Sequence, residues 1–454
     1  MRRSNSSVQP SRLVRQRLRV LLVPDSIHWI TGTIAQSIVA HNDWIDGTII
    51  SGSVLEFIAH EQTDFFDSFD IVHFVCPYAS KRWLPFLRDR VPCVTSHHHV
   101  SDSWELQQHN LDGDAIVVGS LQWASDAIER GAARERLVCI PYGVDSSRFV
   151  STTPHLRSAA RQSLGIAPDA IVVGFFAKLS SNEQDRKGTD IFSAAVQSLI
   201  RDLPNLVVLI IGPGWDTLVA QLRAAGVSCV WHPFVREADR MPLMYQALDF
   251  YWVTARVEGG PVTLLEAMST ELCCVSTPVG LANEVLEDGE NGLLVPFDDV
   301  RAFAQVTLQY ANNPTARATM GARARQTIVA IMDVRVTTRG VEKAYDVAVA
   351  HFNARIAIAG DAASTRGAKR NNDGGRIAPL AQSIVDRVAL LEQLVWAEAL
   401  ILQGQRSLAF RLIAETWVKH PFSTLAPRFL FRNVLPQKLV RTLVRAKLRL
   451  SGSP

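Results

Sequence analysis

The chain has 454 residues, 47% hydrophobic and 20% charged, which excludes a wholly disordered chain, a collagen-like repeat and a coiled coil. The length suits about three domains of ~150 residues, and six cysteines without a CxxC pair indicate reduced thiols and a cytoplasmic protein. The formal net charge of +3 excludes a uniformly basic nucleic-acid-binding protein.

The basic residues gather at the two ends of the chain. Residues 1–24 hold six Arg and residues 416–454 hold eight Lys or Arg, with no acidic residue in either segment, so the body has 33 basic against 44 acidic residues. Basic ends on an acidic body are typical of contact with an anionic surface, for example a membrane leaflet. No apolar run reaches the ~18 residues of a membrane span, and the start resembles no signal peptide.

In the first 150 residues, short apolar runs alternate with helix-like stretches. A buried strand is predicted over residues 19–23, and a helix over 34–40 follows it. Further strands are predicted over 70–74, 92–95 and 115–118. Strands that alternate with helices form crossover units, so this region is predicted to be a doubly wound parallel sheet.

The same alternation begins again after residue 165. Strands are predicted over 171–176, 206–211, 229–231, 250–253 and 274–276. Two doubly wound halves leave a cleft between them, and ligands bind there at the carboxyl ends of the strands. We predict one domain over 19–160, a second over 161–335 and a hinge at 151–163.

The remaining segments lie outside these two domains. We predict a basic tail over 1–18, a helix over 336–355 that crosses back to the first domain, and a small, polar and flexible linker over 356–379. Residues 380–454 follow as a helical hairpin and a basic amphipathic helix over 436–450. That last helix could lie in a membrane interface, or it could dock on its own protein and show its charges to water.

The most informative segment runs from Glu258 to Glu266 and follows a predicted strand. Gly259 and Gly260 free the backbone, and Pro261 suits the first turn of a helix. A helix N-terminus at the carboxyl end of a strand favours an anion such as phosphate. The two glutamates could accept hydrogen bonds from sugar hydroxyls on either side of a diphosphate. The alternative is a simple helix cap with Glu266 on a solvated face.

This segment resembles the signature of family 4 of the retaining glycosyltransferases, which have the GT-B fold. Other stretches resemble motifs of that family in the same order: 114–120, 140–145 with Arg148 and Phe149, 187–188, 211–214, 283–285 and 291–294. Each stretch is weak by itself, but their order and spacing over about residues 19–350 are specific. The resemblance implies an α/β protein with two Rossmann-like domains facing a cleft, followed by a C-terminal helical appendix.

The resemblance implies that the first domain binds an acceptor and the second a nucleotide-sugar donor. Glu266 would bind the ribose hydroxyls, and Glu258 would contact the donor sugar beside the reacting centre. The backbone that holds sugar and phosphate would be that of Gly259, Gly260, Pro261 and Val262. The loop departs from the Gly-Phe-Gly of the family, which weakens any inference about the identity of the donor sugar.

Members of the family clamp the diphosphate with an Arg and a Lys. Lys187 matches the Lys, Lys178 stands where the Arg is expected, and Arg186 is a rival for that role. Two cations stabilise the charge of the leaving group, so neither a metal ion nor another cofactor is expected. A Lys lacks the bidentate fork of an Arg, so this clamp would be softer. The alternative is that both lysines are ordinary surface residues.

The family often carries Thr-x-His after a strand of the first domain, and His97 fits that spacing. His98 and His99 stay open as alternatives, as does a structural role for all three. Adjacent residues of an extended chain point to opposite sides, so a metal site is not predicted. Gly32 stands where the family has two glycines that let the backbone approach the diphosphate.

The predicted function is a retaining glycosyltransferase of the hexosyltransferase type in cell-surface polysaccharide or glycolipid assembly. It would move a sugar from a nucleotide-diphosphate sugar to a hydroxyl of a glycan or glycolipid. By resemblance, the departing diphosphate would help to deprotonate the acceptor. The alternatives are a nucleotide-sugar epimerase or a phosphorylase of the same architecture, or a non-catalytic sugar-nucleotide-binding scaffold. The expected partners are this donor, this acceptor and an anionic membrane at the C-terminal tail, without nucleic acid.

Overall fold

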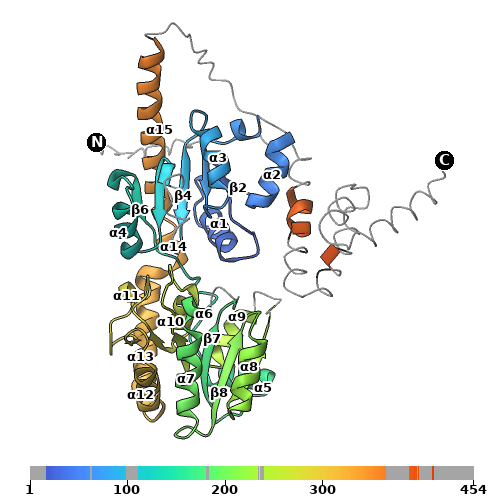
Figure 1. Ribbon diagram of the computed structural model, residues 1–454, viewed down its shortest axis with the longest axis vertical. Helices are drawn as coiled ribbons and strands as arrows, with labels where there is room; N and C mark the ends of the chain where they lie inside the picture. The colour runs from blue at the N-terminus through green and yellow to red at the C-terminus, as the bar shows by residue number, and fades with distance from the viewer. Residues whose placement is uncertain are drawn as a thin grey trace, which may run out of the picture.

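A computed structural model describes residues 17–61, 64–98, 111–179, 184–233, 235, 240–364, 388–395, 397, 409, 412 and 413. His99, residues 1–16 of the predicted tail, residues 365–379 of the predicted linker and the amphipathic helix predicted over 436–450 lie outside these ranges. The fold consists of two six-stranded parallel sheets with helices around them, drawn one above the other in Figure 1.

The first sheet has the strand order β2-β1-β3-β4-β5-β6, and all of its pairs are parallel. Its strands are β1 (Leu18–Leu22), β2 (Ile45–Ile49), β3 (Ile71–Phe74), β4 (Cys93–His97), β5 (Ala115–Val118) and β6 (Leu137–Cys139). Its helices are α1 (Ile30–Ala40), α2 (Gly52–Glu61), α3 (Ser80–Leu87) and α4 (Leu121–Glu129), with short 3-10 turns at Phe65–Ser68 and Arg134–Arg136. The central strands are buried on both faces, which explains their continuous apolar runs.

The second sheet has the order β12-β11-β10-β7-β8-β9 and is also parallel throughout. Its strands are β7 (Ile171–Phe176), β8 (Leu206–Ile211), β9 (Ser228–His232), β10 (Phe250–Val253), β11 (Cys273–Ser276) and β12 (Leu293–Leu294). Its helices are α5 (Pro154–Leu164), α6 (Gln184–Lys187), α7 (Thr189–Leu199), α8 (Asp216–Ala224), α9 (Met241–Gln246), α10 (Val262–Ser269), α11 (Ala282–Val285), α12 (Val300–Ala311) and α13 (Pro314–Thr327). The prediction of two doubly wound parallel sheets is therefore confirmed.

The hinge predicted at 151–163 is wrong, because most of this segment forms α5. The side chain of Thr153 caps the helix, and Pro154 occupies its first turn. Gly165 ends it in the left-handed conformation, with φ of 66°. Small and polar residues suggested a hinge. In this segment, however, they include an N-cap residue and a first-turn proline, and a glycine that ends the helix follows.

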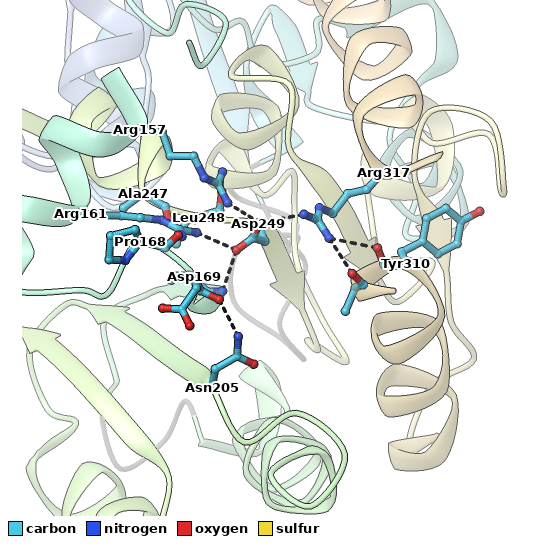
Figure 2. Close-up of polar contacts among 12 residues, drawn as sticks. Arg157, Arg161, Pro168, Asp169, Asn205, Ala247, Leu248, Asp249, Tyr310 and Arg317 are labelled. Atoms are coloured by element: carbon cyan, nitrogen blue, oxygen red, sulfur yellow. Dashed lines mark hydrogen bonds and ion pairs between the residues drawn. The ribbon is translucent and has the colours of Figure 1, made fainter. Parts of the chain in front are cut away.

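A cluster of charges fastens α5 to the second domain, as Figure 2 shows. Asp249, which directly precedes β10, is 4% exposed and forms ion pairs with Arg157 and Arg161 of α5. Arg317 of α13 approaches the same carboxylate at 3.1 Å. The buried negative charge is thus surrounded by three guanidinium groups, and the chain has already reached the second domain when α5 begins.

The chain crosses between the domains twice, and the two crossings lie side by side. Val144 of the first crossing donates a backbone hydrogen bond to Met332 (2.9 Å) and accepts one from Val334 (3.0 Å). The second crossing comprises a π-helical turn at Ile328–Met332 and α14 (Val334–Thr337). Gly143 has no room for a side chain, since a Cβ there would lie 2.2 Å from the hydroxyl of Thr337.

The long helix α15 (Gly340–Ser364) runs back along the first domain (Figure 1). Val341, Tyr345 and Ala348 are buried in the same core as strands of the first sheet. The helix continues past residue 355, where it was predicted to end, so the linker predicted over 356–379 begins inside it. Alanine is frequent in this stretch and has the highest helix propensity, which outweighs the small and polar character that suggested a linker.

Part of the C-terminal appendix docks on the first domain. Residues 388–395 are helical, and Leu391 is buried in the core beneath α2 and α3. Glu392 accepts a hydrogen bond of 2.6 Å from the backbone N–H of Ser51, directly before α2. Among the helices that the structure describes, none is both long and apolar enough to cross a membrane.

Candidate active site

A cavity of about 420 Å³ lies between the two domains, at the carboxyl ends of their strands. The first domain lines it with α1, with the end of β4 and with the crossing that contains Tyr142. The second domain contributes Val262 and Glu266 from α10. This is the position in which doubly wound folds bind ligands.

Glu258 lies in the loop between β10 and α10, where two cations meet it. Its carboxylate forms an ion pair with the ammonium of Lys187, and a guanidinium nitrogen of Arg186 approaches it at 3.4 Å. All three side chains are less than one-fifth exposed. A diphosphate entering the site would compete with the carboxylate for both cations, because phosphate and carboxylate bind the same charged donors.

Lys178 lies elsewhere. It follows β7 and is exposed, and its ammonium lies 4.9 Å from the centroid of the Trp29 ring in the first domain. The structure therefore brings Lys187 and Arg186 together at Glu258, while Lys178 reaches across to Trp29, which directly precedes α1. Of the two candidates for the Arg of the family, Arg186 is the one in contact with Glu258.

Glu266 lies on α10, half-buried at the cavity rather than on a fully solvated face. Its carboxylate accepts a hydrogen bond of 2.5 Å from the hydroxyl of Tyr245, a residue that no sequence motif marks. Burial raises the pKa of Glu266 to about 7, although the Tyr245 hydrogen bond and the charge of Arg148 act in the opposite direction. Buried carboxylates with a raised pKa are typical of functional sites.

Both described histidines of the triplet line the cavity. His97 is 1% exposed, and its Nε2 lies 3.3 Å from the hydroxyl of Thr95. The ring of His98 packs on that of Tyr142, whose hydroxyl lies 2.5 Å from Nδ1, and its Nε2 contacts the carbonyl of Val75. Both imidazoles are thus held in fixed orientations at the first-domain wall.

His73, on β3, is also part of the cavity wall. Its two ring nitrogens contact the hydroxyls of Tyr345 (3.1 Å) and Ser96 (2.8 Å). Complete burial, and then the charge of His98, lower its pKa to about 3. His73 is therefore neutral near pH 7 and connects α15 to the strand that ends at His97.

The glycines of the loop before α10 lie where the two domains touch. The carbonyl of Gly259 accepts a hydrogen bond of 3.0 Å from the indole of Trp123 in α4. A Cβ on Gly260 would lie 2.3 Å from the ring of Tyr142. Pro261 follows as the residue before α10, and its carbonyl accepts the first hydrogen bond of that helix. The close approach of the first domain thus accounts for the Gly-Gly pair.

Gly32 has a local explanation. It lies in the first turn of α1, and a Cβ there would meet the backbone of Ile27 at 2.4 Å. The turn before α1 folds back on the helix at this point, and only glycine permits it. Ile30 and Thr33 on either side of Gly32 line the cavity.

In the part of the chain that the structure describes, no three His, Cys, Asp or Glu side chains gather as a metal site would require. All six cysteines carry free thiols.

Comparison with known proteins finds matches over part of this arrangement. Residues 170–313 match the family model for glycosyl transferases group 1. The lipopolysaccharide core biosynthesis mannosyltransferase LpsB of Rhizobium meliloti (strain 1021) is 31% identical over 192 residues, 38% of this chain and 50% of that protein. A D-inositol 3-phosphate glycosyltransferase of Xylanimonas cellulosilytica is 31% identical over 223 residues, 46% and 52% respectively. The chain thus spans about half the length of the curated relatives that it matches.

Solved structures match over more of the fold. Anabaena HepE in complex with UDP and glucose has a TM-score of 0.60 at 19% identity, covering 72% of this chain and 99% of that one. Sucrose-phosphate synthase from Thermosynechococcus elongatus has a TM-score of 0.59 at 15% identity, covering 74% and 100%. The predicted GT-B fold is therefore confirmed, and the match to the family model for glycosyl transferases group 1 lies within the second domain.

Proposed function

We propose that this protein is a retaining glycosyltransferase that moves a hexosyl group from a nucleotide-diphosphate sugar to a hydroxyl of a glycan or glycolipid. The observation that carries the proposal is the pairing of Glu258 with Lys187 and Arg186 in the loop before α10, the helix whose Glu266 lines the interdomain cavity. These groups lie within or beside the start of α10 in a group 1 glycosyltransferase domain.

The donor would bind mainly to the second domain. The ionised carboxylate of Glu266 would accept hydrogen bonds from the ribose hydroxyls, while the loop before α10 would hold the diphosphate at the helix N-terminus. Lys187 and Arg186 would exchange their ion pairs with Glu258 for ion pairs with the phosphates. The carboxylate of Glu258 would then be available to contact the donor sugar. Lys178, held at Trp29 of the opposite domain, would add a third positive charge at the mouth of the cleft.

In the transfer step, the bond from the anomeric carbon to the diphosphate would break as the acceptor oxygen bonds to that carbon on the same face. The acceptor proton would pass to the departing phosphate oxygen. The protein would contribute orientation and charge stabilisation, since fixed cations near the diphosphate lower the energy of the developing negative charge. His97 and His98 would face the sugar or the acceptor from the first domain.

The acceptor class rests on the names of relatives, among them a lipopolysaccharide core mannosyltransferase and a monoacylated phosphatidylinositol monomannoside mannosyltransferase. We infer that the enzyme works in the cytoplasm, with the basic residues after 418 in contact with an anionic membrane. A chain that lacks residues 419–454 but keeps the docked helix at 388–395 should lose flotation with vesicles of anionic lipid. Undiminished flotation would contradict a role of the tail in membrane binding.

The test of the donor site is nucleotide release from UDP-, GDP-, ADP- and dTDP-sugars without acceptor. One donor should be hydrolysed slowly by the wild-type chain, and Glu266→Ala should abolish both this release and the binding of the nucleotide. Glu290→Ala is the matched control, because Glu290 lies on the surface of the same domain, paired with Arg323. If no donor releases its nucleotide and no nucleotide raises the melting temperature of the protein, the non-catalytic scaffold would be favoured.

A further inference from the structure

Trp123 makes a contact between the domains that none of the proposed roles uses. Its side chain is 4% exposed and packs in the first-domain core with Ile116 and Ala127. At the edge of this core, its indole N–H donates a hydrogen bond of 3.0 Å to the carbonyl of Gly259. Gly259 directly follows Glu258, so a rigid residue of the first domain holds the peptide next to the carboxylate that pairs with the cations.

The two residues before Trp123 contact α11 and the loop before it in the second domain. The carboxylate of Glu284 accepts hydrogen bonds from the backbone N–H groups of Leu121 (2.7 Å) and Gln122 (3.4 Å) at the start of α4. The side chain of Gln122 accepts one of 3.2 Å from the N–H of Gly280. All three residues of the first turn of α4 therefore contact the second domain.

The loop from Glu258 to Pro261, called the donor loop below, needs such an external restraint. Two successive glycines have the widest conformational freedom of any dipeptide, so Gly259 and Gly260 do not fix their own geometry. Gly280 packs directly beneath them, since a Cβ there would lie 2.3 Å from the carbonyl of Glu258. The first turn of α4, which contacts both Gly259 and Gly280, therefore restrains the donor loop.

The direction of one carbonyl determines the direction of the next N–H. In a trans peptide the carbonyl of Gly259 and the N–H of Gly260 point to opposite sides. With the carbonyl directed at Trp123 in the first domain, the N–H of Gly260 points away from Trp123, on the side of the second domain. The N–H of Gly260 would therefore face a donor that is bound at α10.

We propose that Trp123 is a positioning residue for sugar transfer, which fixes the donor loop in its working geometry while the two domains are in contact. The inference rests on the proposed function and adds a first-domain residue to the donor-binding groups, which are otherwise proposed from the second domain. Separation of the domains would break the Trp123 hydrogen bond and release the glycine pair, so the donor loop would be ordered only in the closed enzyme.

The experiment compares Trp123→Phe with Trp83→Phe. Phe at 123 keeps most of the buried aromatic surface and removes the N–H. Trp83 is a matched control, because it is 7% exposed in the first-domain core and its N–H has no hydrogen-bond partner among the described residues. Two quantities are measured for each variant: amide hydrogen exchange over residues 256–262, and kcat with nucleotide affinity for the active donor.

We expect Trp123→Phe to accelerate exchange in the donor loop about tenfold or more, and to lower kcat about tenfold to a hundredfold, the scale of a small misplacement in an active site. Nucleotide affinity should change by less than about threefold, since Glu266 is untouched. Trp83→Phe should match the wild type in exchange and kcat. Equal behaviour of the two variants in both measurements would overturn the proposal.

Two further results separate this inference from the proposed function. If the wild-type chain processes no donor, the proposed function fails, while the exchange comparison still decides whether Trp123 fixes the loop. If Trp123→Phe fails to fold, Gln122→Ala replaces it, because Gln122 is exposed and Ala suits a helix. Faster exchange at Gly280 and in the donor loop would support the proposal, and unchanged exchange at both would contradict it.

Discussion

Glu258 and Glu266 are eight positions apart in one signature, yet their surroundings differ. Glu258 forms ion pairs with Lys187 and Arg186, whose positive charges lie against its carboxylate. Glu266 has a tyrosine hydroxyl as its nearest partner and a pKa raised to about 7. A carboxylate whose burial outweighs its hydrogen bond and the charge of a nearby arginine destabilises the fold when it is ionised. This cost points to a role in binding rather than in stability.

The raised pKa of Glu266 gives a testable pH dependence. The folded protein keeps the Glu266 proton up to about pH 7, whereas the unfolded chain loses it near 4.5. The free energy of unfolding should therefore fall as pH rises from about 4.5 to about 7, by at most about 1.4 kcal/mol per pH unit from this group. Glu266→Gln should remove that slope and make the protein more stable than the wild type at pH 8.

Urea unfolding at pH 5, 6, 7 and 8 measures this difference. Glu290→Gln is the control, since Glu290 is exposed and should leave the slope unchanged. A Glu266→Gln variant that is less stable than the wild type at pH 8 would mean that the ionised carboxylate supports the fold, and it would contradict a role confined to binding.

The sequence could indicate Glu258, Glu266 and Lys187 because all three belong to stretches with fixed spacing. It could not choose between Lys178 and Arg186, since that choice depends on how the chain folds after β7. Trp123 and Tyr142 were missed as partners of the donor loop for a related reason. Each lies more than a hundred positions from Gly259, and a contact at that separation leaves no local pattern.

At the scale of elements, three aspartates make the same pair of hydrogen bonds at the amino ends of strands in the two sheets. Each aspartate directly precedes a strand. Its backbone N–H donates a hydrogen bond to the carbonyl of a residue on the neighbouring strand, and its carboxylate accepts a hydrogen bond from the backbone N–H of that same residue. The pairs are Asp70 with Arg19, Asp114 with Cys93 and Asp249 with Val172. Each pair fixes the register of its two strands at their start, opposite the edge that carries the site.

Asp249 is the member of this group that should matter most for stability. It is 4% exposed and faces three arginines, so Asp249→Asn would leave buried positive charge without compensation (Figure 2). We expect a loss of about 3–5 kcal/mol in the free energy of unfolding. Asp70→Asn should cost much less, because Asp70 is about one-third exposed and, among the described residues, pairs with one arginine, Arg19. Equal losses in urea unfolding of the two variants would contradict this ranking of the two aspartates.

Most strands could be predicted because buried parallel strands are continuous apolar runs. The strands missing from the prediction are three of the four edge strands, β2, β6 and β12; the fourth, β9, is predicted over 229–231. β2 contains Asp46 and Gly47 and is only partly buried, while β6 and β12 have three and two residues. An edge strand depends on its neighbour for its conformation, so its own residues carry little signal.

At the scale of the whole molecule, two segments that follow the second domain in the sequence pack on the first domain. The helix α15 packs on the first sheet, and the helix at 388–395 covers α2. Glu392 and Ser51 are 341 positions apart, so no local pattern could reveal their hydrogen bond. The sequence analysis raised docking only for the helix predicted over 436–450, which lies outside the described residues; the helix that the structure shows docked is the one at 388–395.

The docking of this helix can be tested with two neighbouring leucines. Leu391 is buried in the first-domain core, while Leu390 packs against Leu394 of its own helix. Leu391→Ala should lower the free energy of unfolding of the first domain by about 2–4 kcal/mol and accelerate amide exchange in α2. Leu390→Ala should leave exchange in α2 at its wild-type rate. The same exchange rates in both variants would contradict docking through Leu391.

The central claim is that the cleft between the domains binds a nucleotide sugar and transfers the sugar with retention. Proton NMR during turnover of each nucleotide sugar tests it directly, because it reports both the release of the nucleotide and the anomer that forms first. We predict that one α-linked donor gives an α-configured first product, and that Glu266→Gln abolishes this turnover. A β-configured first product would contradict retention, and no turnover or nucleotide binding with any donor would contradict the claim as a whole.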